Sequence, residues 1–150
     1  MIRPATIHDT DAIIDMMRNY AQASPVPALR LYQNPVHVRT LVTMILSGLG
    51  GIWLSENRGK MCGLIIAIRN PNPWNPDIML AQELAFWVEP DYRNSTHGYK
   101  LLRAYEEWAQ AEVAAGRVHG YTVSRMATSE FDPANHGYTL LEATYIKENK

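Results

Sequence analysis

The chain has 150 residues, of which 47% are apolar, and a formal net charge of −1 at neutral pH. This length predicts one domain, residues 1–150, with a sizeable core, and the near-neutral charge excludes a strong non-specific attraction to nucleic acid. The one cysteine, Cys62, excludes an internal disulfide and fits a reducing cytoplasm. The apolar runs are too short to span a bilayer. We therefore expect a cytoplasmic protein with no membrane partner.

The first half of the chain predicts a short strand at residues 2–6, followed by two helices. Asp9 or Thr10 can cap the first helix, and Asn34 with Pro35 is typical of the start of the second. Between the helices lies a proline-rich loop. The apolar faces of the two helices have helical spacing and comprise Ile13, Met16, Met17 and Tyr20, then Val38, Leu41, Val42 and Ile45.

The middle of the chain predicts three strands. Residues 51–69 contain two strands around a turn at residues 57–59, and the second of these is apolar on both faces, which is typical of a central strand. Residues 70–77, NPNPWNPD, predict a rigid loop, and residues 79–90 predict another central strand.

The last third predicts a long helix that Ser95 or Thr96 caps and Gly116 ends. Its apolar stripe is Leu101, Leu102, Tyr105, Trp108 and Ala109, and we expect Arg103, Glu106 and Glu107 to form its solvated face. A strand at 118–123, a short helix after Asp132 and a final strand at 138–147 follow. Helices separated by a run of strands predict a mixed sheet, not a helix bundle or an alternating βαβ fold.

Four stretches of this chain resemble the GNAT family of acyl-CoA-dependent N-acetyltransferases. They are IRPATIHDTDAI, GGIWLSENRGKMCGLIIAI, ELAFWVEPDYRNSTHGYKLLRAYEEWA and GYTLLEATYIK. The third is also similar to small acetyltransferases of bacteriophage genomes. The resemblance implies an α/β (α+β) fold, the acyl-CoA N-acyltransferase fold, with a mixed, mostly antiparallel sheet flanked by helices. It also implies acetyl-CoA as cosubstrate, without a metal.

The loop from Arg93 to Gly98 resembles the family's pyrophosphate loop, with Thr96 in place of the middle glycine. A helix N-terminus offers unpaired N–H groups to phosphate oxygens, so a threonine there still donates its N–H, although it crowds the site. The alternative is a plain capped helix start. The residues expected to contact the cofactor are Trp87, Val88, Arg93, Asn94, Ser95, Thr96, His97, Gly98 and Tyr99. His97 could contact phosphate when protonated, or pack.

Glu83 is the candidate general base, because it is a charged residue inside an apolar strand. Alternation places Glu83, Ala85 and Trp87 on one face. Desolvation there should raise the pKa of the carboxyl group, as a base requires. A structural glutamate paired with an arginine or with free N–H groups is an equal alternative.

The resemblance also implies a main-chain N–H near Val88 that polarises the thioester carbonyl. The family's general acid, a tyrosine, has no match, because its position falls on Pro133. Tyr138, Ser124 or His136 could substitute, although Tyr138 could equally be a core aromatic and His136 a loop residue. The spacing of histidines and Cys62 indicates no metal site.

The acceptor pocket is expected to be lined by residues 24–34 and by the loop at 71–77, with Tyr32 and Trp74 as aromatic candidates. The sequence thus predicts transfer of an acetyl group to a primary amine by direct attack in a ternary complex, with Glu83 and Tyr138 as catalytic candidates. The alternative is a weak or inactive module that binds acyl-CoA or a protein partner. A homodimer is left open, and nucleic acid is disfavoured as a partner.

Overall fold

The computed structural model describes residues 1–31 and 33–149. It contains the strands β1 (Ile2–Pro4), β2 (Gly50–Asn57), β3 (Lys60–Asn72), β4 (Asn75–Val88) and β5 (Gly120–Thr122) and the helices α1 (Thr10–Gln22), α2 (Pro35–Met44) and α3 (His97–Ala114). The strands form one sheet in the order β1-β2-β3-β4-β5. All neighbours are antiparallel except β4 and β5, which are parallel. The expected mixed, mostly antiparallel sheet is confirmed.

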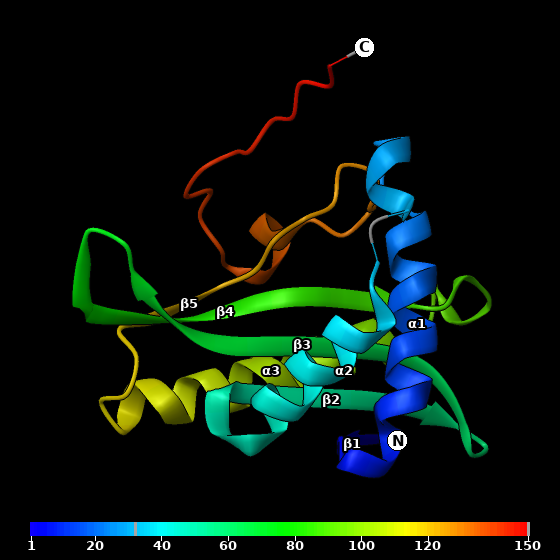
Figure 1. Cartoon of the computed structure of the whole chain (residues 1–150). Helices are drawn as coiled ribbons and strands as arrows, with labels where there is room; N and C mark the ends of the chain where they lie inside the picture. The colour runs from blue at the N-terminus through cyan, green and yellow to red at the C-terminus, as the bar shows by residue number, and fades with distance from the viewer. Residues whose placement is uncertain (32, 150) are drawn as a thin grey trace.

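Helices cover both faces of this sheet, with α1 and α2 on one face and α3 on the other (Figure 1). Two apolar cores result. The first joins Ile13 of α1 and Val42 of α2 to Ile66 and Ala85 of the sheet. The second joins Leu101 and its neighbours on α3 to the opposite face. β3 lies third in the order and contributes to both cores, which confirms that it is central.

Local signals place most of the element boundaries. The Asn34 side chain accepts hydrogen bonds from the N–H groups of Val36 (3.0 Å) and His37 (3.1 Å), which caps α2 as predicted. The turn between β2 and β3 has φ of 52° at Arg58 and 78° at Gly59, the backbone that a two-residue hairpin requires. Gly116 has φ of 73° and follows the last residues of α3.

The proline-rich stretch at 70–77 differs from the prediction of a rigid loop. Most of it belongs to the strands β3 and β4, and only the tip of their hairpin is a turn. The prolines are accommodated because the hairpin projects beyond the neighbouring strands (Figure 1), where fewer ladder hydrogen bonds are needed. Trp74 lies at this tip and is 92% exposed.

A β-bulge interrupts β4. The register pairs Ile66 with Ala85 but Ala67 with Glu83, so that Leu84 is an extra residue. Directly opposite residues point to the same face, and Ala67 belongs to the α3 core whereas Ala85 belongs to the α1–α2 core. The prediction that Glu83 shares a face with Ala85 and Trp87 is therefore wrong.

The predicted solvated face of α3 is also partly wrong. Glu106 is 8% exposed, because its carboxylate accepts hydrogen bonds from Tyr138 Oη at 3.1 Å and from Arg103 at 3.2 Å. Segments beyond β5 thus cover a side of the helix that appeared free in the sequence.

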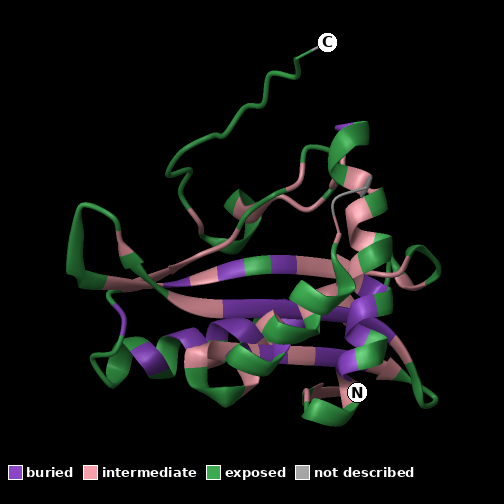
Figure 2. Cartoon of the chain, viewed as in Figure 1, coloured by how far each residue is buried: buried purple, intermediate pink, exposed green. Residues whose placement is uncertain are grey.

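The predicted final strand at residues 138–147 is absent. Residues 139–149 have no regular secondary structure, and most of their side chains are exposed (Figure 2). No other strand among the described residues pairs with this segment. The preceding short helix is present as a single turn, Pro133–His136, which the Asp132 side chain caps.

Candidate active site

A cavity of about 810 Å³ opens where β4 and β5 separate. The two strands pair only from Leu80–Gly120 to Gln82–Thr122. Beyond this point the edge of β4 faces the cavity. The lining comes from α1, β4, the loop after β4, the first turns of α3 and the segment after β5, and includes Tyr20, Glu83, Trp87, Val88, Tyr92, Arg93, Asn94, Ser95, Gly98, Tyr99, Ser124, Phe131 and His136.

Glu83 lies at the point of separation and is only 4% exposed. Its Oε2 accepts a hydrogen bond from the Ser124 N–H at 2.8 Å, which links the two diverging segments. Burial raises the pKa of this carboxyl group to about 7, although the Ser124 hydrogen bond opposes the rise. A carboxyl group that ionises near neutral pH suits a general base, and the same hydrogen bond also gives it a structural role.

The loop from Arg93 to Gly98 joins the end of β4 to α3. Arg93 Nε donates to the carbonyl oxygen of Val88 at 2.9 Å, and its guanidinium lies 4.5 Å from the centre of the Trp87 ring. These contacts hold the loop against the strand. Asn94 has φ of 60°, a conformation that asparagine tolerates better than most residues. The Ser95 hydroxyl donates to the carbonyl oxygen of Tyr92.

The glycine at the end of this loop lies at the start of α3. A Cβ atom at Gly98 would be 3.7 Å from Val88 and 3.9 Å from Phe86, which are ordinary contact distances. The fold therefore does not require a glycine here. Gly98 lines the cavity and has no side chain, so the cavity reaches the backbone at the N-terminus of α3. Binding of a pyrophosphate needs such close approach to the N–H groups of a helix N-terminus.

His97 and Thr96 do not line the cavity. His97 Nδ1 lies 2.5 Å from Ser55 Oγ and 3.5 Å from Cys62 Sγ, so its ring is packed against β2 and β3. Of the two alternatives for His97, the structure shows the packing one. Thr96 is the N-cap residue of α3, but its side chain makes no capping hydrogen bond.

The peptide group of Val88 faces the open edge of β4. The N–H of Glu89 donates to Cys62 of β3 at 2.9 Å. Because successive peptide groups of a strand alternate in direction, the N–H and C=O of Val88 face away from β3. The Arg93 contact to the Val88 carbonyl lies on this side. The Val88 N–H is thus directed where a carbonyl oxygen in the cavity could accept from it.

Tyr138 is not brought to the cavity. Its hydroxyl donates to Glu106, and its ring lies edge-on to Tyr121, with ring centres 6.0 Å apart. Burial and the Glu106 carboxylate raise the pKa of Tyr138. Two other candidate acids, Ser124 and His136, do line the cavity.

Sequence reasoning missed Tyr20 as a cavity residue. Its position in the apolar stripe of α1 gave no sign of a site, because the same spacing serves the core. Its ring packs edge-on to Trp87, and its pKa is raised by burial and then by the charge of Glu83.

The acceptor candidates have different outcomes. Tyr32 lies outside the described residues. Trp74 is at the hairpin tip and does not line the cavity. None of the described residues in the predicted ranges 24–34 and 71–77 is among those that line the cavity. Ala23, just before the first range, does line it, and the Thr128 hydroxyl donates to the Ala23 carbonyl at 3.0 Å. That contact closes one wall of the cavity.

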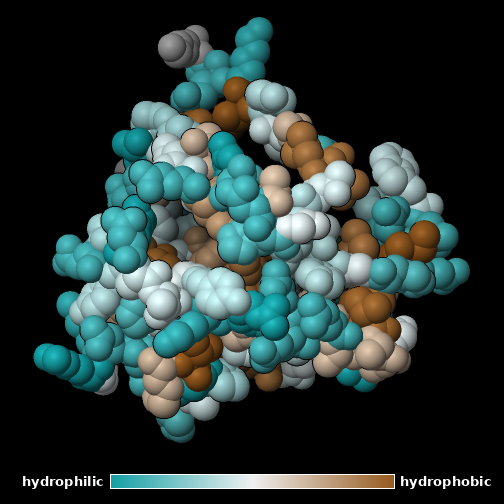
Figure 3. Space-filling view, turned by 180° about the vertical axis from the view of Figure 1, so that it is seen from behind, coloured by the Kyte–Doolittle hydropathy of each residue, from teal (hydrophilic) through white to brown (hydrophobic). Residues whose placement is uncertain are grey.

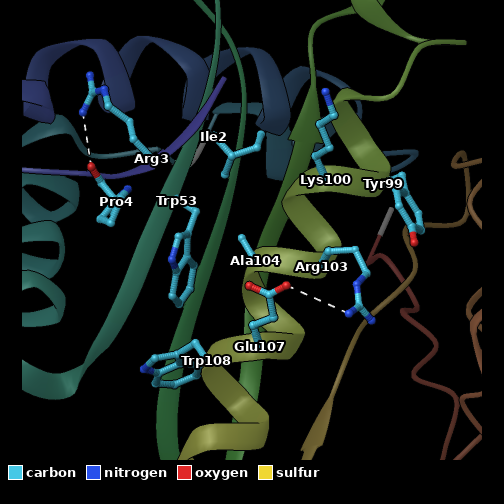
Figure 4. A pocket seen from close by; sticks show the side chains of 10 residues that line it. All are labelled: Ile2, Arg3, Pro4, Trp53, Tyr99, Lys100, Arg103, Ala104, Glu107 and Trp108. Carbon is cyan, nitrogen blue, oxygen red and sulfur yellow. Dashed lines mark hydrogen bonds and ion pairs between the residues drawn. The ribbon is translucent and has the colours of Figure 1, made fainter.

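A second, smaller hollow of about 620 Å³ lies between β1, β2 and the outer side of α3 (Figure 4). Its cations are mostly neutralised, since Arg3 binds Asp9 and Glu56, and Arg103 contacts Glu106 and Glu107. Lys100 and the rings of Trp53 and Trp108 complete it. It contains no buried ionisable group, so the larger cavity is the candidate active site.

Within the described residues, no group of three histidine, cysteine or carboxylate side chains is arranged to hold a metal ion. The helices described here also include none that combines the length and apolar character needed to cross a membrane.

The chain that carries this fold and cavity matches one family model over most of its length. Residues 15–127 match the model of the acetyltransferase (GNAT) family. This chain belongs to that family. No curated protein matches it in sequence.

Solved structures share the fold at low sequence identity. A GCN5-related N-acetyltransferase from Ralstonia eutropha has a TM-score of 0.76 at 19% identity, covering 100% of this chain and 97% of its own. A predicted acetyltransferase from Clostridium acetobutylicum, solved with acetyl-CoA, has a TM-score of 0.75 at 12% identity, covering 99% and 95%. An aminoglycoside acetyltransferase from a soil metagenome, solved with sisomicin, has a TM-score of 0.66 at 12% identity, covering 100% and 94%.

Proposed function

We propose that this protein is an acetyl-CoA-dependent N-acetyltransferase that acts on a primary amine by direct attack in a ternary complex. One observation carries the proposal. A single cavity joins the bare N-terminus of α3, the open edge of β4 and the buried carboxylate of Glu83. Family membership and the acetyl-CoA in one structural neighbour support the choice of cosubstrate.

In this proposal each end of the cavity has a separate task. The N–H groups at the start of α3 bind the pyrophosphate, with Asn94 and Ser95 beside them and Arg93 holding the loop in place. Acetyl-CoA supplies the activated thioester. The Val88 N–H donates to the thioester carbonyl oxygen and stabilises the negative charge that develops there.

The amine must lose a proton to react. An alkylamine with a pKa of about 10.4 is almost entirely protonated at pH 7, so a base near the acetyl group is needed. We assign this task to Glu83, acting directly or through a water molecule. Its pKa of about 7 leaves a substantial ionised fraction at neutral pH, and its basicity is higher than that of an exposed glutamate.

The test is release of CoA thiol from acetyl-CoA in the presence of a panel of amines. The panel includes sisomicin, a peptide with an N-terminal alanine, and a polyamine, because two structural neighbours are an aminoglycoside acetyltransferase and a ribosomal-protein-alanine N-acetyltransferase. We expect thiol release with at least one amine and loss of that rate in Glu83→Gln. An unchanged rate in Glu83→Gln would remove Glu83 from the mechanism.

A second function, a module that binds acyl-CoA without turnover, is favoured by one observation. Tyr138 is engaged by Glu106 outside the cavity and does not supply an acid to the departing thiolate. A thiol with a pKa of about 8.5 can leave without an acid, only more slowly. Binding of acetyl-CoA without turnover on any amine would support this module. The similarity to phage acetyltransferases and the cytoplasmic location stay predictions from the sequence.

A further inference from the structure

A buried polar cluster lies under the first turn of α3. Ser55 of β2 and Cys62 of β3 are fully buried. The ring of His97, the first residue of α3, lies against both: its Nδ1 is 2.5 Å from Ser55 Oγ and 3.5 Å from Cys62 Sγ. The surface of the face that carries α3 is mostly hydrophilic (Figure 3), so the contacts that hold this helix on the sheet lie beneath it.

A β-bulge brings the two buried side chains together. The register shifts between Ser55 and Glu56, which leaves Cys62 as an extra residue of β3 beside the Ser55–Gly63 pair. A Cβ atom at Gly63 would lie 2.9 Å from Leu101, so this point of β3 faces α3. Ser55 lies directly opposite Gly63 and therefore faces α3 as well.

The shortest polar contact of the Ser55 hydroxyl is the one to His97. Cys62 Sγ donates to the carbonyl oxygen of Ser55 at 3.3 Å and lies 3.6 Å from its Oγ, which is a longer contact than that of the ring. On its other side, the ring of His97 lies edge-on to Tyr92, with ring centres 5.8 Å apart. A buried hydroxyl without a partner is costly, so this contact holds the His97 ring in place.

The start of α3 lacks the usual stabilising signals. The Thr96 side chain makes no capping hydrogen bond, and the first turn contains no acidic residue. The first N–H groups of a helix have no partner within the helix, so an uncapped start must be held by other contacts. The side chain of His97 provides such a contact, and the next residue, Gly98, lines the cavity.

We propose that His97 and Ser55 are positioning residues for acetyl-CoA, because their contact fixes the first turn of α3 where its N–H groups receive the pyrophosphate. This inference rests on the proposed function, since it needs the α3 N-terminus to be the pyrophosphate site. Neither side chain lines the cavity, so both act through the backbone at the start of α3. A turn that is ordered for only part of the time binds more weakly by that fraction.

Two substitutions of His97 separate the polar contact from the shape of the side chain. Asparagine carries a polar atom where histidine has Nδ1, whereas leucine branches at the same carbon and is wholly apolar. By calorimetry we expect His97→Leu to weaken acetyl-CoA binding about tenfold, the order of one lost buried hydrogen bond, and His97→Asn to recover most of the affinity. Urea unfolding of each variant establishes that it is folded. Equal affinities of the two variants would overturn the proposal.

A double-mutant cycle tests whether the two residues act through one contact. Ser55→Ala removes the hydroxyl and should weaken acetyl-CoA binding to a similar extent. The double variant Ser55→Ala with His97→Leu should bind no more weakly than His97→Leu alone, because the contact is already lost. Losses that add in the double variant would show two independent effects and would contradict a shared role.

The one cysteine of the chain gives a readout that needs no turnover. Cys62 is buried beneath His97, so iodoacetamide reaches its thiol only when the first turn of α3 lifts from the sheet. We expect saturating acetyl-CoA to slow the alkylation of Cys62 in wild type, as followed by mass spectrometry. Without ligand, His97→Leu should be alkylated faster than His97→Asn. Alkylation that acetyl-CoA does not slow would show that this turn is not coupled to the cofactor.

The outcomes distinguish a failure of this inference from a failure of the proposed function. If wild type and His97→Leu bind acetyl-CoA equally well, the cofactor site stands and the positioning role is wrong. If wild type does not bind acetyl-CoA, the proposed function is wrong and the positioning role is wrong with it. Faster alkylation of His97→Leu without a loss of affinity would show that His97 stabilises the fold alone, which also overturns the positioning role.

Discussion

Glu83 determines how the site responds to pH. As the base it must be ionised, so the rate of transfer at low substrate concentration should rise with pH through about 7, where its carboxyl group ionises. The measurement is kcat/KM for acetyl transfer between pH 5.5 and 8.5. A profile that is flat through pH 7 would contradict the assignment of Glu83 as the base.

The same carboxyl group should reduce the stability of the fold as the pH rises from acid to neutral. Its pKa is about 7 in the folded chain against an ordinary value of 4.5, so the unfolded chain releases the proton first as the pH rises. The free energy of unfolding should therefore fall between pH 4.5 and pH 7 by roughly 3.5 kcal/mol at most, from about 1.4 kcal/mol for each pH unit between the two pKa values.

Glu83→Gln removes this penalty. The free energy of unfolding of the variant, relative to wild type, should therefore increase from pH 5 to pH 8. Urea unfolding of both proteins at the two pH values measures the difference. Glu130→Gln, an exposed carboxylate that also lines the cavity, is the matched control and should follow wild type. Parallel pH profiles for wild type and Glu83→Gln would show that Glu83 is not strained by burial.

Glu83→Gln should also separate binding from chemistry. We expect a fall in kcat of about 10²- to 10⁴-fold, the range for loss of a general base. The affinity for acetyl-CoA should stay within about twofold of wild type, because the amide can still accept from Ser124 and the phosphate contacts are elsewhere. Calorimetry and steady-state kinetics on the same preparation measure both. Equal losses in affinity and rate would indicate a structural role.

At the scale of elements, features that depend on adjacent residues could be predicted from the sequence. Features that depend on pairing between distant segments could not. The cap at Asn34 and the turn at Arg58–Gly59 depend on a few adjacent residues, so they could be predicted. The bulge at Leu84 could not, because it depends on how β4 pairs with β3. The final strand failed for a related reason: strand propensity at 138–147 does not say which edge the strand pairs with.

In the candidate site, too, the sequence indicated the type of residue but not the contacts that distant segments make with it. Alternation within a strand placed a carboxylate of low exposure at Glu83 but put it on the wrong face, since one extra residue reverses the pattern. Tyr138 was misplaced because Glu106, read as a solvated residue, accepts its hydrogen bond. Tyr20 was overlooked because a core residue and a cavity residue have the same spacing on α1.

The start of α3 gives a prediction that separates folding from binding. Gly98→Ala should fold normally, because its Cβ makes ordinary contacts. It should nevertheless weaken acetyl-CoA binding by about tenfold or more, because a methyl group occupies the space where the phosphates approach the backbone. Thermal unfolding and calorimetric titration of the same variant measure the two effects.

Gly116→Ala, at the other end of α3, is the control with the opposite pattern. Gly116 has φ of 73°, so alanine there should cost about 1 kcal/mol of stability. The residue does not line the cavity, so acetyl-CoA affinity should be unchanged. If both variants bind acetyl-CoA like wild type, the α3 N-terminus is not the pyrophosphate site.

For the whole molecule, the account depends on one cavity that receives acetyl-CoA at the end of α3 and an amine near Glu83. β1 and β5 are the two edge strands of the sheet, and the cavity lies beside β4 where β5 separates from it. The fold is common to many acetyltransferases, so the fold alone does not establish that this chain binds the cofactor.

The most direct measurement is calorimetric titration of the full chain with acetyl-CoA, beside the variant Gly98→Glu. We predict saturable binding of one acetyl-CoA per chain in wild type and its loss in Gly98→Glu, whose carboxylate would repel the pyrophosphate and fill its space. Circular dichroism of the variant establishes that it is folded. Absence of binding by wild type, or equal binding by a folded Gly98→Glu, would contradict the central claim that the Arg93–Gly98 loop and α3 hold acetyl-CoA.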